Sequence, residues 1–286
     1  MDAIERLVQG SIDMHVHHGP DAHIRRRVDA LQAALQAEQA GMRAIVLKNH
    51  DYPTAPLASI VGQHVHNLTV FGSLCLDFAI GGLNPVAVET SAILGARVVW
   101  MPTFSSANDH QKLKIKGEGI KITDSKGKLL PEVQAILDII KSKDMVLATG
   151  HVSAAESFAL VDEARQQGLT KIVVTHPLAT RIGATLTVEQ QQQMADKGAF
   201  IEHCFLCTLP LGDRLDPKEM AAAIKAVGAE HCIMSTDMGQ EWNPPPAEGM
   251  RMIVSTLLQC KISAKEIELM VKVNPARLLG LTPDPT

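Results

Sequence analysis

The sequence has no apolar run long enough to cross a membrane. A membrane-spanning helix needs about 20 predominantly apolar residues, and no stretch of the 286 residues approaches that length. The opening residues MDAIERLVQG also lack the apolar core of a signal peptide. We therefore expect a cytoplasmic protein with no membrane partner.

Cysteine, aromatic side chains and basic clusters are also scarce. Five cysteines are an odd number, which argues against a disulfide framework in a chain without an export signal. Cys204 and Cys207 form a lone CxxC, and we interpret both as buried thiols because a structural zinc site usually needs a second pair. The net charge is −4 and no basic patch is present, so nucleic acid is excluded as a partner. Aromatic residues make up 3% of the chain and leave few side chains to stack on a substrate.

The composition, 46% hydrophobic and 20% charged, is that of a globular protein. Eight short, nearly continuous apolar runs alternate with helical patterns whose apolar residues recur every three to four positions. The runs begin at Ser11, Arg43, Leu68, Ala96, Met145, Lys171, Ala199 and His231. This alternation predicts a single (β/α)8 TIM barrel over residues 1–286, with a doubly wound open sheet as the alternative fold.

One connection is much longer than the others. Residues 103–130 precede a helix predicted to begin at Pro131, and residues 124–127 carry a hairpin-turn signal. Long loops in compact domains are usually functional or mobile, and in a barrel this one leaves from the face that carries catalytic residues. We predict an insertion, or lid, that brings these residues to a substrate pocket: Asn108, His110, Lys114 or Lys116.

Polar side chains follow the ends of several predicted strands. In chain order they are His15, His17, Lys48, His50, His151, His176, Glu202, His203 and Asp237. The carboxyl ends of parallel strands share one face of a barrel, where catalytic groups gather. Residues two apart on a strand point to the same side, so His15 and His17 can bind one ion.

A single histidine at a strand end is most often a hydrogen-bonded rim residue, and IDMHVHHGP could hold three of them. Coincidences at four separate strand ends favour a metal site instead. The predicted ligands are His15, His17, His151, His176 and Asp237. Neutral imidazoles and a carboxylate suit zinc, and also manganese, iron or nickel. His18 would support this site from the rim.

The order of these motifs resembles the amidohydrolase superfamily of metal-dependent hydrolases. The matching stretches are DMHVHH, GH, THP and STD at the first, fifth, sixth and eighth strands, and VNPARLLGL near the C-terminus. The resemblance covers residues 11–281. It implies that His15 and His17 bind the more buried metal with Asp237, and that His151 and His176 serve a second metal or the substrate. It also implies that Asp237 is the base that takes a proton from the water activated by the metal.

The fourth run, RVVWMP, departs from the superfamily pattern. Two-metal members usually carry a bridging carboxylated lysine or glutamate there, and this run has neither. Lys48 or Glu202 could substitute as a bridge. We interpret Lys48 instead as a salt-bridge or substrate-carboxylate contact, and Glu202 as a support for a ligating histidine. One ion is therefore expected rather than two.

We predict a metal-dependent hydrolase that cleaves an amide, lactone or related C–N or C–O bond in a small, anionic molecule. The residues predicted to bind the substrate are Lys48, His50, Arg181 and Lys114. The alternatives are a metal-dependent decarboxylase of a small carboxylic acid, a phosphoesterase and a non-catalytic metal-binding protein. Tyr52 and Trp242 could line the pocket, and an exposed apolar helix face would allow a homo-oligomer.

Overall fold

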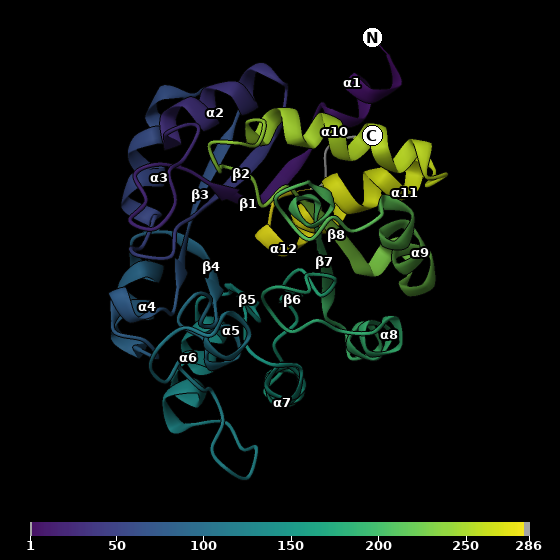
Figure 1. Ribbon diagram of the computed structural model, residues 1–286. Helices are drawn as coiled ribbons and strands as arrows, with labels where there is room; N and C mark the ends of the chain where they lie inside the picture. The colour runs from purple at the N-terminus through teal and green to yellow at the C-terminus, as the bar shows by residue number, and fades with distance from the viewer. Residues whose placement is uncertain (1, 283–286) are drawn as a thin grey trace.

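All eight apolar runs form β-strands in the computed structural model, which describes residues 2–282. The strands are β1 Ile12–His17, β2 Ala44–Lys48, β3 Thr69–Cys75, β4 Ala96–Trp100, β5 Val146–Ala148, β6 Ile172–Val174, β7 Phe200–Cys204 and β8 Cys232–Ser235. They pair in parallel in chain order, and the backbone N–H of His17 donates to the carbonyl of Met238 to close β8 onto β1. The predicted (β/α)8 barrel is confirmed, with helices around the strands (Figure 1).

Most of the helices begin after a side chain that caps them, and the four without such a cap have a proline in their first turn. They are α1 Ala3–Val8, α2 Ala30–Gln39, α3 Ala55–Val61, α4 Pro85–Ile93, α5 Ala107–Leu113, α6 Pro131–Ser142, α7 Ala154–Gln166, α8 Val188–Asp196, α9 Pro217–Val227, α10 Pro246–Gln259, α11 Ala264–Glu268 and α12 Asn274–Leu279. Asp29 and Ser153 cap α2 and α7 in capping boxes, each satisfying backbone N–H groups that have no partner within the helix. Five short 3-10 or π segments complete the order: η1 Gly62–His64, η2 Phe78–Ile80, η3 Phe205–Thr208, η4 Ala229–His231 and η5 Leu269–Val273.

The core has two layers, one between strands and helices and one inside the barrel. The interior layer includes Ile12 from β1 and Trp100 from β4, and Leu278 and Leu279 of α12 pack against it. The side chain of Asn274 fixes α12 by donating to two backbone carbonyls near the start of β8. Apolar side chains therefore fill the amino-terminal end of the barrel, and polar side chains gather at the opposite end.

The long insertion after β4 has structure of its own. Residues 103–130 contain α5 and a hairpin in which Thr123 pairs with Leu129, so the predicted turn at 124–127 is present. Lys112 of α5 donates to the carbonyl of Gly183 at 2.7 Å and so ties the insertion to the loop after β6. Hydrogen bonds therefore hold part of this insertion against the loop after β6.

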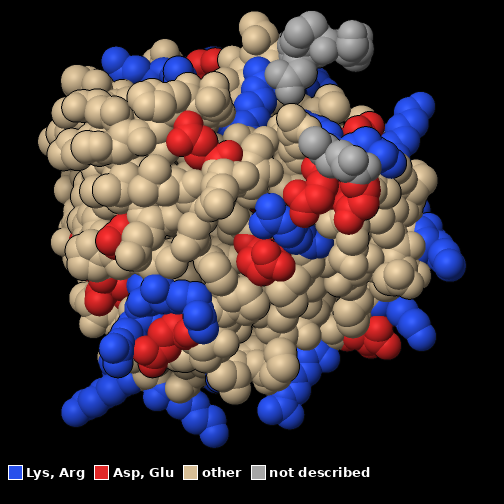
Figure 2. All heavy atoms as spheres, turned by 90° about the horizontal axis from the view of Figure 1, so that it is seen from above, with Lys and Arg blue, Asp and Glu red and all other residues tan. Residues whose placement is uncertain are grey.

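Two features of the exterior bear on partners. None of the helices within residues 2–282 combines the length and the apolar character needed to cross a membrane. On the face shown in Figure 2, Lys and Arg lie among Asp and Glu, and neutral residues cover most of the surface. That face therefore offers no extended basic surface.

Candidate active site

His15, His17 and Asp237 converge at the carboxyl end of the barrel. Nε2 of His15 and Nε2 of His17 each lie 3.1 Å from Oδ1 of Asp237, and all three side chains are buried. Strand alternation produces this pair, since Val16 between the histidines packs into the outer core. Burial raises the pKa of Asp237, but the two imidazoles outweigh burial and hold that pKa well below its ordinary value. Asp237 is therefore held as a carboxylate between the two imidazole rings.

The backbone is strained at two residues of this site. Asp237 has φ of 56° and His176 has φ of 26°, in the left-handed region that non-glycine residues rarely adopt. Glycines make room for both segments: a Cβ on Gly183 would lie 2.8 Å from the His176 ring, and one on Gly239 would lie 2.2 Å from the carbonyl oxygen of His17. Strain of this kind clusters at functional sites because surrounding structure must hold it in place.

β7 supports His15 from behind. Nδ1 of His15 lies 3.4 Å from Oε2 of Glu202 and 3.6 Å from Sγ of Cys204. An acceptor on one ring nitrogen places the proton there and leaves the lone pair on the other, as metal-binding histidines require. His203 points away from this cluster; both its ring nitrogens are buried without a hydrogen-bond partner, and burial lowers its pKa to about 4.

Lys48 of β2 contacts the other ring nitrogen of His15. Its Nζ lies 3.0 Å from Nε2 of His15 and 5.1 Å from the centre of the Trp100 ring, and the side chain is almost fully buried. As an ammonium group, Lys48 donates to the lone pair of His15 that a metal ion would use. An ion at His15 and the ammonium form of Lys48 therefore exclude one another.

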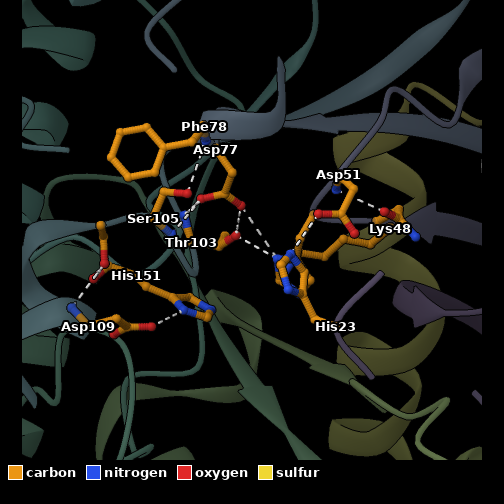
Figure 3. Close-up of polar contacts among 12 residues, drawn as sticks. His23, Lys48, Asp51, Asp77, Phe78, Thr103, Ser105, Asp109 and His151 are labelled. Carbon is orange, nitrogen blue, oxygen red and sulfur yellow. Dashed lines mark hydrogen bonds and ion pairs between the residues drawn. The ribbon is translucent and has the colours of Figure 1, made fainter. Parts of the chain in front are cut away.

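His151 and His176 form a second imidazole pair. Their Nε2 atoms are 3.0 Å apart, and Nδ1 of His151 lies 2.5 Å from Oδ2 of Asp109 in α5 (Figure 3). The carboxylate of Asp109 accepts a hydrogen bond from Nδ1–H of His151, so Nε2 of His151 accepts and Nε2 of His176 donates. Burial, followed by the proximity of His151, lowers the pKa of His176 to about 3 and keeps this imidazole neutral.

A third relay orients His50. Nδ1 of His50 lies 2.6 Å from the hydroxyl oxygen of Thr103. Thr103 in turn donates to Asp77, just beyond β3 (Figure 3). The direction of this relay leaves Nε2 of His50 as an acceptor. Burial raises the pKa of Asp77, but the hydrogen bonds from His50 and Thr103 lower it to about 2. Phe104 stacks on the His50 ring with centroids 3.8 Å apart.

Donor atoms suited to a metal gather in three groups among residues 2–282. In each group, ligand atoms lie within 4.8 Å of one another. The groups are His15, His17 and Asp237; His15, Glu202 and Cys204; and His50, Cys75 and Asp77. Only the first of them has every member within the predicted ligand set.

These side chains open into a cavity with two lobes. The first lobe, of about 560 Å³, is lined by His17, Ile24, Arg26, Lys48, His50, Phe104, His151, Ile182, Leu206, Leu211, Asp237, Gln240 and Trp242. The second lobe, of about 600 Å³, is lined by Leu113, His176, Ala179, Arg181, Ile182, Leu206, Cys207, Leu211, Gly212, Asp213 and Asp237. Asp237 lines both lobes and therefore stands where they meet.

The other residues predicted to bind the substrate or to support the site lie in different places. Arg181 lines the second lobe, whereas Lys114 is exposed at the end of α5 and lines neither lobe. His18 is buried in the rim, where Nδ1 lies 3.0 Å from the carbonyl oxygen of Gly19 and the ring meets Tyr52 edge-on.

The other residues expected from the insertion also lie outside the lobes. Asn108 instead donates to the carbonyls of His151 at 2.9 Å and Gly183 at 2.7 Å, and His110 and Lys116 are not among the lining residues.

The residues of this site that sequence reasoning missed include Arg26, Asp77, Phe104 and Asp109. Asp77 had a signal, because it directly follows the third apolar run as the other site residues follow theirs. Asp109 and Arg26 had none, since a helix and a loop carry them across the face.

Solved structures share this fold at low sequence identity. An amidohydrolase from Pseudomonas aeruginosa matches with a TM-score of 0.65 and 14% identity over 98% of each chain. A putative 2-pyrone-4,6-dicarboxylic acid hydrolase from Pseudomonas putida matches with a TM-score of 0.61 and 17% identity over 95% of this chain and 98% of that chain. A 2,6-dihydroxybenzoate decarboxylase from Rhizobium matches with a TM-score of 0.59 and 13% identity over 95% and 99%. The resemblance to the amidohydrolase superfamily is thus confirmed for the fold.

Comparisons of sequence place the chain more narrowly. No curated protein matches it. The profile of one family matches residues 10–202, about two thirds of the chain. The chain therefore belongs to a family of unknown function, DUF6282.

Proposed function

We propose that this protein is a metal-dependent hydrolase of the amidohydrolase type. Its substrate is a small anionic molecule, and the bond cleaved is an amide, lactone or related C–N or C–O bond. The observation that carries this proposal is the convergence of His15, His17 and Asp237 at the junction of the two lobes. Buried donor atoms at the bottom of an open cavity are what a catalytic metal site requires.

The donor set fits a divalent ion. His15, His17 and Asp237 would hold it, with Glu202 supporting His15 and the His151–His176 pair available for a second ion. Zinc is the expected metal, with manganese, iron or nickel as alternatives and one ion rather than two. When bound, such an ion acts as a Lewis acid and lowers the pKa of water.

The chain's own residues then handle protons and charge. Asp237 accepts the proton of the attacking water and passes it to the leaving group, since it stands between the lobes as a carboxylate. The Nε2–H group of His176 donates to the substrate oxygen that gains charge, in place of its bond to His151. Lys48, His50 and Arg181 line the cavity and contact the substrate.

The first test is the metal content of protein purified without added metal, measured by elemental mass spectrometry. We expect about one equivalent, lost in the double variant His15→Ala/His17→Ala. His64→Ala/His66→Ala is a matched control, because it removes two exposed histidines with the same spacing. A wild-type protein that takes up no metal even after reconstitution contradicts the proposal.

The second test addresses Asp237 directly. Screens of amides, lactones and aromatic acids identify a substrate, and Asp237→Asn is then expected to keep metal but lose most turnover. The amide is close in size to the carboxylate but cannot accept the proton as a base. Full turnover in this variant would remove Asp237 from the chemistry.

A decarboxylase is the second candidate function. The buried cations Arg26 and Lys48 line the first lobe together, which suits a carboxylic acid substrate. Release of carbon dioxide without C–N or C–O cleavage would decide for this candidate. The cytoplasmic location and the homo-oligomer stay predictions.

A further inference from the structure

Arg26 is a buried cation with an unused donor. It lies in the segment between β1 and α2, its side chain is 1% exposed, and it lines the first lobe. Nε and Nη2 donate to Oδ2 of Asp21 at 2.9 and 2.7 Å, and Nη2 also lies 3.2 Å from Nδ1 of His17. Nη1 is buried without a hydrogen-bond partner. Buried polar groups are almost always paired in folded proteins, so this donor calls for an acceptor from outside the chain.

The contacts of Arg26 fix the direction of that donor. Asp21 occupies the edge formed by Nε and Nη2, and the backbone of Arg26 pairs with Gln240. Because the guanidinium is planar, holding one edge orients the Nη1 end as well. The group is therefore preorganised for an anion before any ligand arrives.

The remaining wall of the first lobe is mostly apolar. Ile24, Phe104, Leu206, Leu211 and Trp242 contribute hydrocarbon or aromatic surface. A ligand that fits this wall has an apolar or aromatic body, with its charge confined to one end. A phosphate group would need more donors than one free guanidinium nitrogen provides.

We infer that the first lobe binds a small carboxylic acid with an apolar body, and that Nη1 of Arg26 anchors its carboxylate. The orientation of the substrate in this inference rests on the proposed function. In that orientation the reacting group faces Asp237, and the leaving group occupies the second lobe near His176 and Arg181. Lys48 also lines this lobe, with Nζ 3.0 Å from Nε2 of His15.

Benzoate is the probe for this subsite, with benzamide as its neutral counterpart. Isothermal titration calorimetry on wild-type protein should show benzoate binding at least tenfold tighter than benzamide. Arg26→Gln should weaken benzoate binding at least tenfold and leave benzamide unchanged. Arg25→Gln is the matched control: Arg25 is the adjacent arginine, its side chain is 85% exposed, and it pairs with Glu241 at the surface.

Two further measurements separate anchoring from structural support. Arg26→Gln leaves Asp21 buried without its cation, so the double variant Asp21→Asn/Arg26→Gln is measured beside it. Loss of benzoate binding with an unchanged Tm in the double variant supports the anchor. Benzoate binding as tight as wild type in both variants, or tighter binding of phenyl phosphate than of benzoate by wild type, overturns it.

Titration of chelator-treated and metal-loaded protein distinguishes this inference from the proposed function. Benzoate binding that depends on Arg26 in both states supports the subsite whatever the metal content. Binding that depends on metal but is unchanged by Arg26→Gln overturns the anchor and leaves the metal chemistry intact. A wild-type protein that binds neither benzoate, cyclohexanecarboxylate nor hexanoate also overturns the anchor.

Discussion

Replacing His203 with leucine should change how the stability of the protein depends on pH. His203 lies on β7 with 1% of its surface exposed, and neither ring nitrogen has a hydrogen-bond partner. Burial lowers its pKa from 6.5 to about 4, because an imidazolium in this position would lose its hydration. The side chain is therefore neutral in the folded protein at pH values where the unfolded chain carries a proton.

The sign and size of the effect follow from the two pKa values. Above pH 6.5 neither state is protonated and His203 has no effect on pH dependence. As pH falls from 6.5 towards 4, the unfolded state gains a proton that the folded state does not bind, so stability decreases. The difference between the two values corresponds to on the order of 3 kcal/mol, and most of it, about 2 kcal/mol, is lost between pH 7 and pH 4.5.

Urea unfolding followed by circular dichroism at pH 7, 5.5 and 4.5 measures this effect. His203→Leu should gain about 2 kcal/mol relative to wild type between pH 7 and pH 4.5. His64→Leu, at an exposed histidine, should show the wild-type dependence. Equal pH dependence in His203→Leu and wild type would refute the argument that His203 is held neutral by burial.

Three other substitutions test the site itself. Lys48→Met should raise zinc affinity at least severalfold in competition titrations, because it removes an ammonium group 3.0 Å from the nitrogen of His15 that would bind the ion; a lower affinity would make Lys48 a ligand. Gly183→Ala should push the His176 ring aside, since the added Cβ would lie 2.8 Å from it, and should lower turnover while metal content stays unchanged. Asp109→Asn should lower turnover by roughly 10–100-fold, because the imidazole pair loses the carboxylate that sets its proton positions; wild-type rates would contradict that role.

The barrel could be predicted because its signals are local. Each strand is a short apolar run, and each helix has its own periodicity and begins at a capping residue or a proline, so neither signal depends on distant contacts. The histidines of the site could be predicted for the same reason, since each follows a strand and a parallel barrel places the carboxyl ends of all its strands on one face. His15 and His17 needed only strand alternation, and Asp237 only its position after β8.

The hydrogen-bond partners of those histidines could not be predicted in the same way, because they depend on contacts between distant parts of the chain. Glu202 was expected to support a histidine, but the sequence could not say which one, because that depends on the twist and closure of the barrel. Asp109 comes from a helix in the insertion, and its place beneath His151 arises only when α5 docks against the loop after β6. The charge of Lys114 suggested a role in substrate binding, but the structure places this residue at the exposed end of α5, outside both lobes.

The position of Lys48 bears on the absence of a bridging lysine or glutamate from the fourth strand. β4 supplies Trp100 where a bridging ligand would be expected, and Lys48 from β2 lies over that indole with its Nζ beside His15. A protonated lysine there is a donor and occupies the lone pair of His15; a carboxylated lysine would be an acceptor and could bind an ion. The two states have opposite consequences for the Lys48→Met variant, since losing a competitor tightens zinc binding and losing a bridge weakens it. With the proton of His15 on Nδ1, facing Glu202, Nε2 has a lone pair that accepts from the ammonium group of Lys48. Tighter binding is therefore the result that the geometry supports.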